Sequence, residues 1–164
     1  MLEIGNRSEI LLPGDRAPSL KLARIFNRGD QVTELVLDRL SVVILWNAGC
    51  AGCLPLVTEI AAFAKPSHVP CYAIAVLVRD IEATAAAIAN SETAAIFALE
   101  APAKEPSGLS RGLVTRQWAE ASGQPGVPAA FIVGNNSIIL WMGYPSEIKR
   151  VLPDIRSGSW NVQL

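Results

Sequence analysis

The sequence has few cysteines, a single histidine and almost no net charge. Three cysteines and one histidine occur among its 164 residues, and the net charge at pH 7 is −1. Three cysteines cannot all pair within one chain, which argues against a framework of structural disulfides. Because acidic and basic residues are interspersed and form no basic face, we expect no nucleic-acid partner.

Long apolar stretches are also missing. Although 51% of the residues are hydrophobic, no stretch approaches the roughly 20 apolar residues that span a bilayer, so we expect no membrane insertion. Residues 1–7 lack the basic and apolar regions of a signal peptide, which predicts a cytoplasmic protein. A mature exported protein would begin in the same way, so a periplasmic location stays open.

The length of the chain predicts one domain, spanning residues 1–164. Its core is expected at about residues 11–153, followed by a flexible polar tail from Ser157 to Leu164. No repeat or low-complexity segment divides the chain, and we expect a monomer.

Apolar patterning predicts an α/β fold with a central mixed sheet flanked by helices. Val42 to Trp46 is a continuous β-branched and aromatic run, which is typical of a strand buried on both faces. A hairpin is expected before it, parallel strands and helices after it, and an antiparallel hairpin around Asn135 and Asn136 at the end. The expected strands are 20–26, 31–37, 42–46, 71–78, 94–99, 129–133 and 138–142. The expected helices run from the cysteine pair to Pro66 and over 81–90, 113–121 and 146–152, the last capped by Ser146, and a long loop is expected at 101–110.

Cys50 and Cys53 are the residues with the clearest chemistry. A helix that begins beside Cys50 favours its thiolate form, because the helix dipole and free N–H groups point at the sulfur. A spacing of three residues brings the two β-carbons to roughly 5 to 6 Å, close to disulfide geometry. The pair therefore predicts dithiol-disulfide exchange, in which Cys50 attacks a partner disulfide and Cys53 resolves the mixed disulfide.

The alternative for this pair is half of a zinc or iron–sulfur site. Such sites usually need four ligands, and the chain offers only Cys71 and His68 besides. We therefore favour a redox pair with no metal and no other cofactor. Cys71 opens an apolar strand and is expected in the core, whereas His68 is expected in a surface loop. Trp118 and Trp141 could line a groove, but their apolar surroundings favour the core and we assign them no role.

Three segments together resemble the thioredoxin-like superfamily: Val42 to Trp46, Cys50-Ala51-Gly52-Cys53, and Gly126-Val127-Pro128. The TlpA-type thiol-disulfide oxidoreductases fit best, and Pro13 to Pro18 resembles an N-terminal motif that they share with the AhpC/TSA-related peroxiredoxins. The resemblance covers roughly residues 11–153. It implies a thioredoxin-like fold with an N-terminal β-hairpin, a protein disulfide or dithiol as substrate, and a second redox protein that regenerates the chain.

The resemblance also implies a substrate-binding surface. Pro128 is expected to follow a cis peptide bond and to face the cysteine pair, while Val127 offers backbone hydrogen bonds to an extended substrate. X-Pro bonds adopt cis at a low cost, which is compatible with that expectation. Trp46, four residues before Cys50, stands where the family often has tryptophan and is assigned to the same surface.

The sequence departs from the family in several places. Gly49 and Gly52 replace a tryptophan and a proline that are common there, and Ile44 and Leu56 stand where buried acids assist proton transfer. Glu59 is the nearest acid in sequence, but it is expected on a solvated helix face, so the proton acceptor is unidentified.

Three other functions stay open. A non-catalytic binding module that keeps a vestigial disulfide would explain the missing acids. A peroxiredoxin-like peroxidase would need a threonine and a proline where the chain has Asn47 and Val43. A copper metallochaperone would need a C-x-x-x-C spacing and a distal histidine, which the sequence does not contain.

Overall fold

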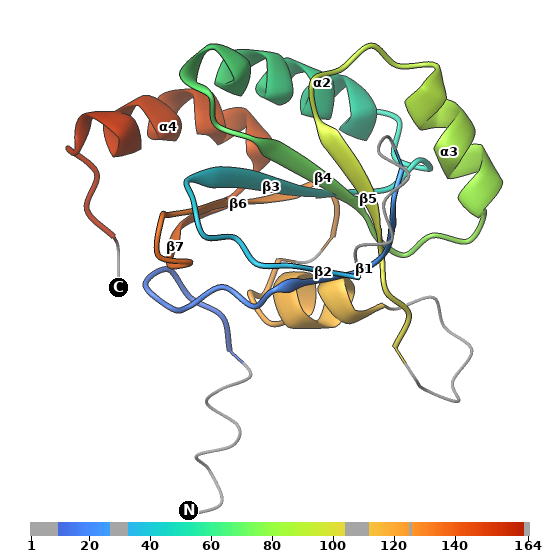
Figure 1. Cartoon of the computed structure of the whole chain (residues 1–164), viewed down its shortest axis with the longest axis horizontal. Helices are drawn as coiled ribbons and strands as arrows, with labels where there is room; N and C mark the ends of the chain where they lie inside the picture. Colours follow the sequence, from blue (N-terminus) through green and yellow to red (C-terminus); the bar gives the residue numbers. More distant parts are fainter. Residues whose placement is uncertain (1–9, 27–32, 104–111, 125, 163–164) are drawn as a thin grey trace, which may run out of the picture.

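Seven strands of the chain pair side by side in one mixed sheet, in the order β2-β1-β5-β4-β3-β6-β7 (Figure 1). The computed structural model describes residues 10–26, 33–103, 112–124 and 126–162. The strands are β1 (Leu20–Ile25), β2 (Glu34–Leu35), β3 (Ser41–Trp46), β4 (Cys71–Ala75), β5 (Ile96–Glu100), β6 (Ala129–Val133) and β7 (Ile139–Gly143).

Strand β3 lies near the middle of the sheet, as its continuous apolar sequence predicts. It pairs in parallel with β4 and antiparallel with β6, and all six of its residues are buried. β4 pairs in parallel with β5, whereas β1 pairs antiparallel with both β5 and β2. The predicted N-terminal hairpin, parallel centre and C-terminal antiparallel hairpin are therefore confirmed.

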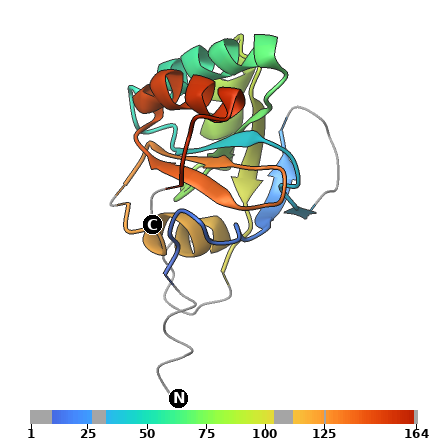
Figure 2. The ribbon, with the colours of Figure 1, turned by 90° about the vertical axis from the view of Figure 1, so that its left-hand side faces the viewer.

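Three α-helices cover one face of the sheet: α2 (Cys53–Ala64), α3 (Ile81–Ala89) and α4 (Ile148–Ser157). A π-helix, η2 (Thr115–Glu120), lies against the opposite face, as the two ribbon views show (Figures 1 and 2). Two short 3₁₀ helices, η1 (Lys65–Ser67) and η3 (Pro145–Glu147), follow α2 and precede α4. Within the described ranges, no helix is both long enough and apolar enough to cross a bilayer.

The sheet separates two hydrophobic cores. Successive side chains of a strand point to opposite faces, so Val42, Ile44 and Trp46 pack with α2 and α4. Val43 and Leu45 pack instead with Trp118 of η2 on the other face. Trp118 and Trp141, for which the sequence favours the core over a groove, are both buried.

Several predicted boundaries are wrong. β4 ends at Ala75, because the chain turns at Leu77, whose φ is 56°. β5 begins at Ile96 and includes Glu100, β2 has two residues, and the positive φ of the β6–β7 turn falls on Ser137. Most of the predicted loop at 101–110 lies outside the described residues.

The C-terminal segment is held more firmly than its polar sequence suggests. α4 continues to Ser157, and Ser146 lies inside η3 and does not cap α4. The indole N–H of Trp160 donates a hydrogen bond to the Leu140 carbonyl at 3.0 Å, and the ring packs against the α2-side core. The segment thus contacts the fold as far as Trp160, and the flexible tail stays a prediction.

Candidate active site

The cysteine pair lies where the central strand passes into a helix. β3 ends at Trp46 and α2 begins at Cys53. Cys50 and Cys53 are joined by a disulfide, with their Cα atoms 5.4 Å apart. Cys53 is 0% exposed, whereas Cys50 is half-buried. An incoming sulfur therefore reaches Cys50, the residue that the sequence assigns to the attack.

Asn47 organises the loop between Trp46 and the disulfide. Its carbonyl accepts a hydrogen bond from the Cys50 N–H at 3.0 Å, and its side-chain oxygen accepts one from Gly49 N–H at 2.8 Å. Its amide nitrogen donates to the carbonyls of Val76 and Leu77, at 2.7 and 3.1 Å. The sequence analysis considered Asn47 only because a peroxidase would have a threonine at that position. The signal that could have found it is the preference of asparagine for turns, where its side chain bonds nearby backbone.

The start of α2 supports the redox pair electrostatically. Gly52 is its N-cap, and in this part of the described chain no side chain caps the helix and no acidic residue occupies its first turn. The positive end of the helix dipole therefore acts on the sulfurs without competition from a carboxylate, which favours a thiolate over a thiol. A β-carbon at Gly52 would meet no atom within 4 Å, so the surface beside the disulfide is open.

Val127 and Pro128 lie at the same edge of the sheet as the disulfide. Leu45 pairs with Ala129, so Pro128 lies beside Trp46, directly before the cysteine loop. The Val127–Pro128 peptide bond is cis, as the resemblance implied. Both residues are half-buried. The structure therefore brings together two of the three residues expected at the substrate surface with the cysteine pair.

Trp46 does not belong to that surface. Its side chain is 0% exposed and packs edge-on against Phe97, with the ring centroids 5.5 Å apart. The prediction that Trp46 contacts a substrate is wrong, because β3 places alternate side chains inside the α2-side core. Trp46 instead lies beneath the loop that carries Cys50.

The remaining residues considered for chemistry lie away from the disulfide. Cys71 pairs with Val42, at the other end of β3 and β4 from the cysteine loop, and burial raises the pKa of its thiol to about 12. His68 is exposed, and the exposed Glu59 pairs with Lys149 at 2.9 Å. Among the described residues, no three histidines, cysteines or acids gather in a way that could hold a metal ion.

Glu100 is a second residue near the site that the sequence analysis missed, after Asn47. It ends β5 and is only 6% exposed. Its carboxyl group accepts hydrogen bonds from the N–H of Leu77 at 2.9 Å and the N–H of Thr115 at 2.7 Å. The available signal was an acidic residue directly after the apolar run Ile96 to Leu99, at the edge of the sheet where the parallel strands end.

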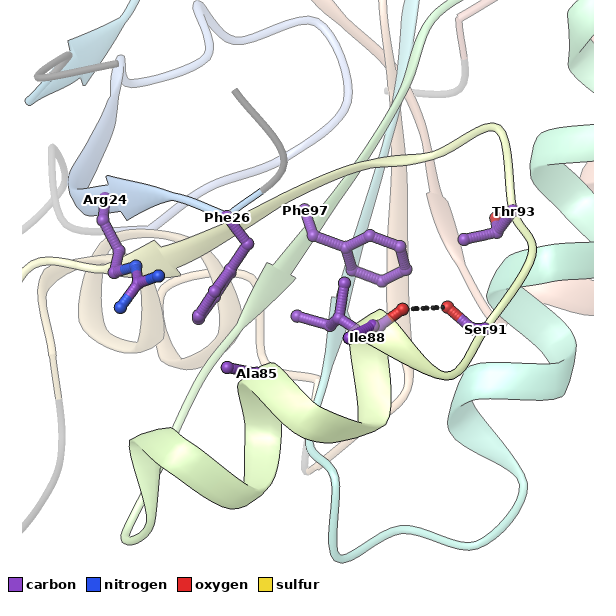
Figure 3. Close-up of a pocket in the computed structure, with 8 residues that line it drawn as sticks. Arg24, Phe26, Ala85, Ile88, Ser91, Thr93 and Phe97 are labelled. Atoms are coloured by element: carbon purple, nitrogen blue, oxygen red, sulfur yellow. Dashed lines mark hydrogen bonds between the residues drawn. The ribbon is translucent and has the colours of Figure 1, made fainter. Parts of the chain in front are cut away.

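A surface hollow of about 250 Å³ lies elsewhere, between β1, β5 and α3 (Figure 3). The Arg24 guanidinium lies 4.5 Å from the centre of the Phe26 ring at one end, and Ser91 bonds the Ile88 carbonyl near the other. Its lining includes no residue of the cysteine loop and neither Val127 nor Pro128. The hollow is therefore separate from the redox pair.

Comparison with known proteins finds no protein-family model and no curated sequence that matches the chain. Solved structures match it closely in shape. A thiol:disulfide interchange protein from Bacteroides sp. superposes with a TM-score of 0.65 at 18% identity, over 91% of this chain and 93% of its own.

A thio-disulfide isomerase from Thermus thermophilus gives a TM-score of 0.64 at 19% identity, over 94% of this chain and 100% of its own. A putative thiol:disulfide interchange protein DsbE from Chlorobium tepidum gives 0.58 at 17%, over 92% and 99%. Identities this low establish the fold alone. The chain has the thioredoxin-like fold that its motifs predicted, with the cysteine pair at the junction of the central strand and its helix.

Proposed function

We propose that the chain is a thiol-disulfide oxidoreductase that exchanges the Cys50–Cys53 pair with a partner protein. The observation that carries the proposal is the disulfide itself, with an accessible Cys50 and a buried Cys53 at the start of α2. The names of the structural relatives from Bacteroides sp. and Thermus thermophilus describe the same chemistry and support it.

In the reducing direction, the Cys50 thiolate attacks one sulfur of the partner disulfide. A bond forms between Cys50 and that sulfur, and the other partner sulfur leaves as a thiolate and takes a proton. Cys53 then loses its proton and attacks Cys50 Sγ. This step breaks the mixed disulfide, restores the Cys50–Cys53 bond and leaves the partner with two thiols. Two electrons pass to the partner, whose two sulfurs take up the proton that Cys53 releases and one proton from solvent, and the reverse sequence oxidises the partner.

The position of Val127 and Pro128 supports a role for both in holding the partner. They lie beside the cysteine loop, ahead of the first residue of β6. An extended segment of the partner placed along Val127 would present its sulfur to Cys50, while proline, which has no N–H, does not extend the sheet further. The reaction uses no cofactor, and a second redox protein restores the starting state of the pair.

The equilibrium potential of the pair tests this function. The protein is equilibrated in glutathione or dithiothreitol buffers, and its free thiols are counted by alkylation and mass measurement. We expect one reversible two-electron transition, which Cys53→Ser abolishes. A potential near −270 mV suits a reductase in the cytosol, whereas a value near −120 mV suits an oxidant in a compartment such as the periplasm.

A matched pair of variants tests whether the protein forms a mixed disulfide that can be trapped. Cys53→Ser keeps the attacking sulfur and should remain bonded to a disulfide-containing peptide, whereas Cys50→Ser should capture none. A protein with no reversible transition and no trapped peptide would be a binding module that keeps a vestigial disulfide.

A further inference from the structure

We propose that Glu100 is a positioning residue for Cys50, acting through Leu77 and Asn47. The inference rests on the proposed redox function, which it deepens by naming what holds the nucleophile's loop in place. It concerns the one buried carboxyl group in the described part of the chain.

Glu100 joins two segments of the chain that are distant in sequence. One carboxyl oxygen accepts from Leu77 N–H, and the other accepts from Thr115 N–H. The Thr115 hydroxyl lies 2.8 and 3.0 Å from the two oxygens and donates to the same group. A buried carboxyl group is costly unless it is hydrogen-bonded. These three donors therefore explain why it is tolerated at the edge of the core.

The hydrogen bond to Glu100 stabilises an unfavourable backbone conformation of Leu77. Its φ of 56° lies in the left-handed region, and its side chain is 39% exposed, so little packing holds it there. This conformation is unfavourable for a leucine because its β-carbon approaches the following carbonyl. The hydrogen bond from its N–H to Glu100 fixes the peptide in that conformation.

Hydrogen bonds through Asn47 connect Leu77 to the cysteine loop. The carbonyls of Val76 and Leu77 accept hydrogen bonds from the side-chain amide of Asn47. The side-chain oxygen of Asn47 accepts from Gly49 N–H, and its backbone carbonyl accepts from Cys50 N–H. Fixing Leu77 therefore fixes the orientation of the Asn47 side chain. That orientation sets the backbone in front of Cys50.

Glu100 reaches the cysteine loop through hydrogen bonds. β5, which carries Glu100, is separated from β3 by β4, and the carboxyl group accepts from Leu77 and Thr115. Leu77 in turn accepts from Asn47, so Glu100 acts on Cys50 through these intervening hydrogen bonds.

The test measures how fast iodoacetamide alkylates Cys50 across pH, in a Cys53→Ser background where Cys71 is buried and unreactive. In Glu100→Gln, the amide N–H₂ must face one of the two backbone N–H groups, so one hydrogen bond is lost. We expect alkylation at neutral pH and reduction of insulin disulfides by the Cys53-containing variant to slow about tenfold. The midpoint of the alkylation profile should rise by about half a pH unit. Glu59→Gln, which removes an exposed carboxylate, should match the parent protein.

A second substitution distinguishes positioning from general loosening. Glycine adopts a positive φ without strain, so Leu77→Gly should restore most of the alkylation rate that Glu100→Gln loses. Should Glu100→Gln fail to fold, Glu100→Asp, which withdraws the carboxyl group by one methylene, takes its place with the same expectations.

Two results would overturn the inference. One is a folded Glu100 variant that alkylates and reduces insulin at the parent's rate, and the other is a slowed variant that Leu77→Gly does not rescue. Failure of the redox function is recognised separately, because the wild-type protein itself would then show no reversible Cys50–Cys53 transition.

Discussion

At the scale of single residues, burial assigns a different chemistry to each cysteine. Cys50 is half-buried and open to an incoming sulfur, and Cys53 is fully buried behind it. Cys71 is buried at the far end of β4, where no disulfide partner is present among the described residues. Because a thiol reacts as the thiolate, the raised pKa of Cys71 leaves Cys50 as the reactive sulfur of the reduced protein.

The pKa of Cys71 predicts how stability changes at alkaline pH. Burial raises that pKa from 9.0 to about 12, so between these values the unfolded chain loses the proton and the folded protein keeps it. Below pH 9 both states hold the proton and the effect is absent. Above it, the free energy of unfolding should fall by about 1.4 kcal/mol per pH unit.

Urea unfolding of the oxidised protein at pH 8 to 10.5 measures this effect, with Cys71→Ala as the reference that shares every other titrating group. The difference between the two proteins should shrink as the pH rises. A difference that stays constant would show that the Cys71 thiol ionises equally well in the folded protein.

The sequence predicted the roles of residues that depend on neighbours in the sequence. It missed the roles of residues that depend on contacts between distant parts of the chain. The Cys50–Cys53 spacing alone predicts a disulfide within reach of one helical turn. Trp46 was wrongly assigned to the surface, because only the alternation along β3 shows that its side chain points inward. Glu100 gave little signal, since its donors at Leu77 and Thr115 are distant in sequence.

At the scale of elements, a side chain caps the N-terminus of α3, whereas none caps the N-terminus of α4. The Asp80 side chain accepts a hydrogen bond from Ala83 N–H at 3.0 Å and so caps α3. Ser146, which the sequence predicts as the cap of α4, lies inside η3 instead, and neither η3 nor α4 has a side-chain cap. The pattern of a polar residue before an apolar run is the same in both places, and only the backbone conformation distinguishes them.

This difference predicts unequal effects of alanine at the two positions. Asp80→Ala should lower the free energy of unfolding by about 1 kcal/mol, because the first turn of α3 loses its acceptor. Ser146→Ala should change it by less than about 0.5 kcal/mol, as expected for an exposed side chain without such a role. Urea titration of both variants checks the pair, and equal losses would contradict the assignment.

Elements with a strong pattern were predicted best. β3 is continuously apolar because both of its faces are covered, and its predicted and observed ranges differ by one residue. β2 has only two residues at the edge of the sheet, where pairing with β1 defines it and the sequence pattern does not. α4 continues past Pro153 to Ser157, so the sequence placed its end too early.

At the scale of the whole molecule, β3 belongs to both cores. Its alternate side chains enter the α2-side core and the η2-side core, and its backbone pairs with β4 and β6. Cys53 belongs to the first of these cores, so one residue of the redox pair is packed in the core beneath the helix α2. Cys50 is half-buried, and its loop is exposed to solvent.

This arrangement predicts the order in which backbone amides exchange with solvent. The central amides of β3, at Val43, Ile44 and Leu45, should exchange only when the whole protein unfolds, because opening β3 disrupts both cores and two strand pairings. Amides of β2 should exchange fastest among the strands, since β2 is short and lies at the edge. Hydrogen exchange followed by NMR measures each site, and the free energies of exchange in β3 should equal the free energy of unfolding from urea.

Reducing the disulfide should speed exchange in the first turn of α2 and leave β3 the slowest strand, because the disulfide constrains the loop from Cys50 to Cys53 and does not constrain any strand pairing of the sheet. Faster exchange in β3 than in β7 would contradict the central place of this strand in the stability of the fold.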